Sequence, residues 1–74
     1  MNKPYTTSEL IDQLYTNLRF MAPQGAESQY IAGYLQHTLK DVAENGIDAL
    51  VSTVDWTNQQ VEAKRKVLEA TTYA

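Results

Sequence analysis

Cysteine is absent from the 74-residue chain, which excludes disulfide bonds, thiolate metal sites and thiol nucleophiles. Small secreted domains usually rely on disulfides, so this absence predicts a reducing, cytoplasmic setting. Residues 1–8 carry no apolar run after their single cation, and nowhere do eighteen apolar residues follow one another. The sequence therefore predicts neither a signal peptide nor a membrane span.

Positive charge is also scarce. Six Lys and Arg residues face nine Asp and Glu residues, which leaves a net charge of −3. A chain without a basic field is a poor ligand for nucleic-acid phosphates or anionic lipid, so we expect no nucleic-acid and no membrane partner. The one basic cluster, at 64–66, lies late in a predicted helix, where cations favourably meet a negative helix end.

What the chain does contain is typical of one small globular domain over residues 1–74. Hydrophobic residues make up 43% and charged residues 20%, too apolar for disorder. A chain of this length buries only about 60% of its unfolded surface. Such domains often gain stability from a partner or from a second copy of themselves.

Helix start and stop signals predict an all-α fold, a bundle of three main helices over about 6–22, 27–45 and 57–71. Thr6 and Glu9 form a capping box, and Tyr5 and Leu10 a hydrophobic staple. Gly46 ends the second helix in a left-handed Schellman turn. Apolar stripes at helical spacing predict two core faces, one with Leu10, Leu14, Leu18 and Met21, the other with Ile31, Leu35, Thr38, Leu39 and Val42.

The segment after Gly46 supports two interpretations. In the preferred one, a short helix over about 48–54 is followed by a corner at Asp55-Trp56. Thr57 and Gln60 then form a second capping box, stapled by Trp56 and Val61. In the other, one continuous helix runs from 48 onward.

Groups for catalysis or metal binding are few. His37 is the sole imidazole, so a nucleophilic site would need His37, Asp41 and a serine in one enclosed cavity. His37, Asp41 and Glu44 share a ridge, but structural metal sites generally draw ligands from several elements. An EF-hand alignment of 41–52 lacks the bidentate acid at its last position, Ser52. We expect a non-enzyme without cofactor or metal.

A row of polar-edged rings lies beside the core stripe of the second helix. Tyr30, Tyr34, His37 and Asp41 form a ridge turned about 110° from that stripe, at 100° per residue. Phe20 falls opposite the leucines of the first helix, and Trp56 is either the staple or a further anchor. Aromatic rings of this kind are common in interface hot spots, although a neighbouring helix could also pack on the ridge.

These observations favour a non-catalytic protein-interaction module: an adaptor, inhibitor or regulatory subunit that binds through Tyr30, Tyr34, His37, Phe20 and Trp56. A structural homo-oligomer, with a homodimer as its simplest form, is the alternative. An acidic mimic of nucleic acid is the third, weakened by the scatter of the nine acids. As a short acidic cysteine-free helical chain, the sequence resembles many small proteins of bacteria and phages. Some of these bind host enzymes, which implies a host protein as partner.

Overall fold

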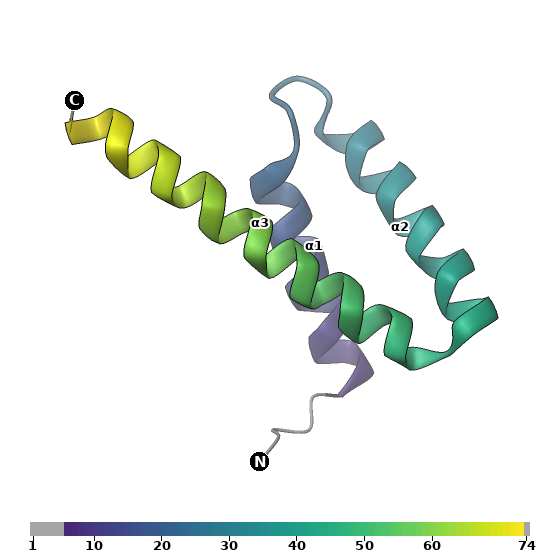
Figure 1. The fold of residues 1–74 in the computed structure, drawn as a ribbon. Helices are drawn as coiled ribbons and strands as arrows, with labels where there is room; N and C mark the ends of the chain where they lie inside the picture. Colours follow the sequence, from purple (N-terminus) through teal and green to yellow (C-terminus); the bar gives the residue numbers. More distant parts are fainter. Residues whose placement is uncertain (1–5, 74) are drawn as a thin grey trace, which may run out of the picture.

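The computed structural model describes residues 6–73, with side chains described as far as residue 70. Over this range the chain forms three helices and no strand: α1 (Thr7–Met21), α2 (Glu27–Asn45) and α3 (Ile47–Tyr73). The predicted all-α bundle is confirmed. Helix α3 crosses α1 and continues well beyond it, while α2 returns along the other flank of α3 (Figure 1).

Helix α1 begins as its capping box predicts. The Thr6 hydroxyl accepts a hydrogen bond from the Glu9 amide at 3.1 Å, and the Glu9 carboxylate accepts one from the Thr6 amide at 2.9 Å. These two bonds satisfy amides that a helix leaves unpaired at its start. The predicted staple involves Tyr5, which lies outside the described residues.

Gly46 separates α2 from α3. Its φ of +87° suits glycine, and its amide donates to the Val42 carbonyl at 2.8 Å. The predicted boundary is confirmed, but ψ is −175° and departs from the left-handed helical conformation of a Schellman turn. Ile47 already belongs to α3 and is 45% exposed.

The predicted fourth helix is wrong, because α3 is one helix of 27 residues with no corner at Asp55-Trp56. Thr57 is not an N-cap. Its hydroxyl donates within the helix to the carbonyls of Thr53 and Val54, at 2.9 and 3.0 Å, and its side chain is fully buried. A threonine that bonds back to the preceding turn is compatible with a helix interior, so the Trp56–Val61 staple does not form.

The core lies where α3 crosses α1 and contains Leu10, Leu14, Leu18, Leu50 and Val54. Helix α2 contributes one buried residue, Thr38, and covers the core with half-buried side chains such as Ile31 and Leu35. The predicted core position of Leu39 is wrong, since 67% of its surface is exposed. Helix α2 is thus the peripheral helix, because only one edge of its apolar stripe contacts the core.

A polar cluster links α1 to α3 beside this core. The Asn17 amide donates to the Thr57 hydroxyl at 3.0 Å and to the Asn58 side-chain oxygen at 2.7 Å. The Gln13 amide donates to the Asn17 oxygen at 3.0 Å. Asn17 is only 3% exposed, so these bonds compensate the cost of burying its amide.

Lys64, on α3, makes a second polar contact with α1, near the end of that helix. Its ammonium donates to the Phe20 carbonyl at 2.7 Å and lies 5.1 Å from the Phe20 ring centroid. The last carbonyls of a helix lack internal partners and carry partial negative charge. The basic cluster therefore meets a negative helix end, and that end belongs to α1.

Candidate protein-binding surface

Three aromatic side chains form a continuous strip between α2 and α3, here called the aromatic strip: Tyr30, Tyr34 and Trp56. The ring centroids of Tyr30 and Tyr34 lie 5.9 Å apart and are tilted by 49°. Those of Tyr34 and Trp56 lie 6.5 Å apart, with planes 26° from parallel. Both separations are favourable for aromatic pairs, so each ring supports the next.

The two tyrosines pack on the hydrophobic core, because α3 crosses the flank of α2 that carries the ridge. Both are half-buried. Trp56 stacks on Tyr34 and is 48% exposed, which makes it the most exposed ring of the strip. Tyr34 is thus the support, and Trp56 presents its ring surface to the outside.

A shallow hollow of about 240 Å³ lies beside Trp56, lined by Tyr34, His37, Asp41, Ala49, Ser52, Thr53 and Trp56. Asp41 is half-buried and His37 is exposed. On α2, residues 34, 37 and 41 recur at helical spacing, and on α3 residues 49, 52, 53 and 56 do so. The hollow therefore depends on α3 continuing through residue 55 as a regular helix.

Burial raises the pKa of the Tyr34 hydroxyl above its ordinary value, and the neighbouring Tyr30 adds to the shift. Removal from water disfavours the charged phenolate. Tyr34 is therefore neutral at physiological pH. Its hydroxyl can donate a hydrogen bond to a ligand in the hollow.

Phe20 does not join this surface. It lies at the end of α1, with the Lys64 ammonium 5.1 Å and the Arg65 guanidinium 5.8 Å from its ring centroid. The structure thus brings together four of the five side chains predicted for the binding site, namely Tyr30, Tyr34, His37 and Trp56. Phe20 belongs to a different face, between α1 and α3.

The sequence predicted the α2 side of the hollow and Trp56, but not the other three lining residues on α3. Ala49, Ser52 and Thr53 carry no individual signal, since small residues are common on helices. A continuous helix would have placed them on the same face as Trp56 by their spacing of three and four. The predicted corner at Asp55-Trp56 concealed that relation.

The hollow holds His37, Asp41 and Ser52, the residue types of a nucleophilic triad. No hydrogen bond joins these three side chains, and the Thr53 hydroxyl beside them donates to the Ala49 carbonyl. Within the part of the chain that the structure describes, no three His, Asp or Glu side chains are close enough to hold a metal ion. No described helix has the length and apolarity that crossing a membrane requires.

Comparisons with protein-family models, with curated proteins and with solved structures give no match for this chain.

Proposed function

We propose that the protein is a non-catalytic interaction module that binds another protein through the aromatic strip and the hollow beside it. The observation that carries the proposal is the state of Trp56. Its ring is half-exposed, yet stacking on Tyr34 orients it. Tryptophan is the residue most enriched in interface hot spots, and an oriented ring loses little conformational freedom on binding.

The shape of the surface favours a protein over a small molecule. The hollow holds about 240 Å³, whereas pockets for small ligands enclose roughly 300–1,000 Å³. A partner side chain of moderate size fills such a hollow while the surrounding helix faces make a flatter contact. Asp41 and His37 at its edge supply a polar rim around the aromatic centre.

Trp56 is the residue to perturb and, in the wild-type chain, also the reporter of contact. The affinities of wild type and Trp56→Ala are compared by titration calorimetry, because the variant has no tryptophan. Partners are captured from native-host lysate and identified by mass spectrometry, and the purified partner is then titrated against the wild-type chain. Trp56 is the only tryptophan. A change in its fluorescence therefore reports contact at the strip, provided that the partner does not itself emit in the tryptophan range. We expect Trp56→Ala to weaken binding by at least roughly thirtyfold, since hot-spot truncation costs about 2 kcal/mol or more.

Leu39→Ala is the matched control, because Leu39 is a more exposed apolar residue on the opposite flank of α2. It should leave affinity unchanged, and both variants should keep the wild-type circular dichroism spectrum. Trp56→Ala is preferred to serine substitutions at Tyr30 and Tyr34, which pack on the core and would also alter the fold. Equal affinity of wild type and Trp56→Ala would refute the proposal.

A further inference from the structure

The hollow beside Trp56 contains a carboxylate that no cation of this chain neutralises. Asp41 lines the hollow and is half-buried. Over residues 6–70, no ion pair and no side-chain hydrogen bond joins the Asp41 carboxylate to another residue, His37 included. A partly desolvated carboxylate is attracted to a cation more strongly than a carboxylate in open water. The hollow therefore favours a positively charged group from outside.

The chain around this hollow has the same sign of charge. Between residues 41 and 63 there are five Asp or Glu residues and no Lys or Arg. This stretch includes the end of α2, Gly46 and the whole α3 side of the hollow. Lys40 precedes it and does not line the hollow. A surface of one sign attracts a partner of the opposite sign and speeds their encounter.

The aromatic strip also lacks a cation of its own. Tyr15 and Phe20 each have a basic side chain over the ring, with 5.1 to 5.8 Å between the charge and the ring centroid. In the described part of the chain, no such cation lies over Trp56 or Tyr34. Tryptophan attracts cations to its face more strongly than the other aromatic side chains do. The exposed ring of Trp56 is therefore an open cation–π site.

We propose that this hollow receives an arginine side chain of the partner protein, whose guanidinium stacks on the Trp56 ring and pairs with the Asp41 carboxylate. The inference rests on the proposed function and specifies the partner as a basic protein surface. Arginine suits the site better than lysine, because its planar group stacks on rings, matches a carboxylate and is weakly hydrated. Tyr34 and Ser52 line the same hollow and offer hydroxyl oxygens as further acceptors.

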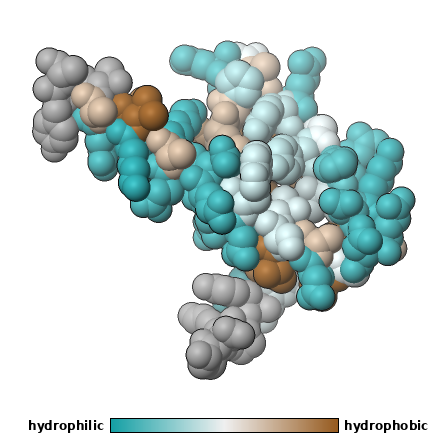
Figure 2. Space-filling model, viewed as in Figure 1, coloured by the Kyte–Doolittle hydropathy of each residue, from teal (hydrophilic) through white to brown (hydrophobic). Residues whose placement is uncertain are grey.

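The visible face of the molecule is consistent with a contact of this polar kind. Figure 2 shows it as mainly hydrophilic, with hydrophobic colour in small areas only. Such a face offers no broad apolar area to a partner. Specificity then depends on a few rings and charges, which an arginine can satisfy together.

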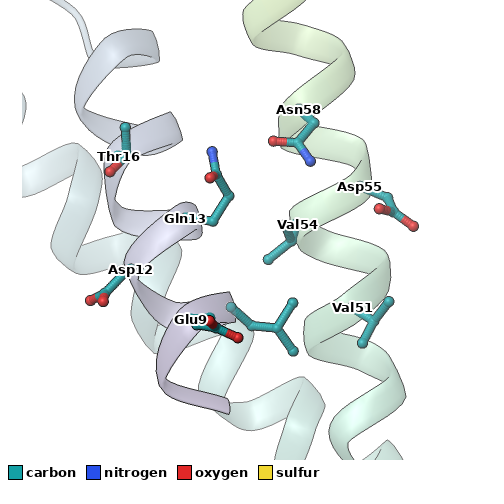
Figure 3. A pocket seen from close by; sticks show the side chains of 9 residues that line it. Glu9, Asp12, Gln13, Thr16, Val51, Val54, Asp55 and Asn58 are labelled. Carbon is teal, nitrogen blue, oxygen red and sulfur yellow. The ribbon is translucent and has the colours of Figure 1, made fainter. Parts of the chain in front are cut away.

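A second concave surface, between α1 and α3, is the alternative place for a cation. It holds about 500 Å³ and is lined by Glu9, Asp12 and Asp55, without Lys or Arg. Figure 3 shows Asp12 and Asp55 on the two rims of this space. All three acids are exposed, no aromatic ring lines the surface, and the Glu9 carboxylate already accepts from the Thr6 amide. Because water and salt screen exposed charges, a cation gains less there than beside Trp56.

The test titrates N-acetyl-arginine amide into the isotope-labelled chain at fixed ionic strength. NMR follows the indole N–H signal of Trp56, the only tryptophan. N-acetyl-citrulline amide is the matched probe, since it has nearly the same shape and no charge. The arginine probe should shift the signal along a saturating curve, with a Kd at least roughly fivefold below that of citrulline. N-acetyl-lysine amide should bind more weakly than arginine, and an equal lysine curve would overturn the choice of arginine.

Three variants locate the binding site of the probe. Asp41→Asn should weaken arginine binding at least roughly threefold and leave citrulline unchanged. Glu44→Gln removes the same charge one turn later on α2, and Asp12→Asn removes a carboxylate from the α1/α3 surface. Both should leave the arginine curve unchanged. Equal curves for arginine and citrulline overturn the inference, as does an Asp41→Asn curve like the wild type or a loss that either control shares.

The proposed function and this inference fail in different ways. A purified partner whose affinity falls with Trp56→Ala but not with Asp41→Asn binds the strip through another kind of side chain, so only the inference is overturned. A partner whose affinity falls with both variants supports the two together. An affinity that is unchanged by Trp56→Ala refutes the function and the inference with it.

Discussion

The buried amide of Asn17 offers the sharpest test of what holds α1 and α3 together. Asn17→Ala removes three hydrogen bonds, two of them directly across the helix pair. At about 0.5–1.5 kcal/mol net per bond, with some loss of packing, the expected cost is roughly 2–4 kcal/mol. A 74-residue chain at about 0.05–0.15 kcal/mol per residue has a total stability of ~4–11 kcal/mol, so this loss is a large fraction of it.

Urea unfolding followed by circular dichroism and by the fluorescence of Trp56, which adjoins Thr57, measures this cost. The urea midpoint should fall, and the thermal midpoint should drop by about 4–8 °C per kcal/mol. Gln29→Ala, which removes an exposed amide from α2, should change stability by less than about 0.5 kcal/mol. A similarly small change for Asn17→Ala would refute the reasoning.

A double substitution separates the hydrogen bonds from the packing. Asn17→Leu alone leaves the Thr57 hydroxyl without its amide donor in a fully buried position. Asn17→Leu with Thr57→Val removes both polar groups, and replacing both members of a buried polar pair by apolar groups is often neutral or stabilising. The double variant should therefore be more stable than Asn17→Leu.

Two further predictions concern the α2–α3 connection and the aromatic strip. Gly46 has φ +87° and ψ −175°, a region open almost only to glycine, so Gly46→Ala should destabilise the fold by about 1–3 kcal/mol in urea unfolding, whereas Gly33→Ala inside α2 should not. The pKa of Tyr34 is raised in the fold, so above about pH 10 the unfolded chain releases this proton first and folding stability falls as pH rises further. Tyr34→Phe should make that fall shallower between pH 9 and 11, and an unchanged slope would contradict the role of Tyr34.

Local sequence signals predicted the fold where the deciding interactions are themselves local. The Thr6–Glu9 capping box needs only residues three apart, and Gly46 ends α2 through its own backbone freedom. Thr57 shows where such signals fail, because a capping-box pattern also fits a threonine inside a helix. Its place is determined by Asn17, forty residues earlier, and by the apolar neighbours that bury it.

The candidate surface was predictable to a similar extent. Helical spacing placed Tyr30, Tyr34 and His37 on one ridge, and that holds for any regular helix. Which helix covers the ridge is a question of tertiary packing, and a helical wheel does not contain the answer. Phe20 was misplaced for the same reason, since its neighbours on α3 lie more than forty positions away.

The unbroken course of α3 also determines how the molecule can move. A corner at residue 55 would act as a hinge and let the following segment swing. Instead, Leu50, Val54, Thr57 and Val61 are buried in one helix, while every side chain from 62 to 70 is exposed. Lys64 and Arg65 still contact Phe20 of α1, so the direction of these last turns is determined by the packed part of the helix (Figure 1). A load or label attached near residue 70 is therefore held at a defined angle to the bundle.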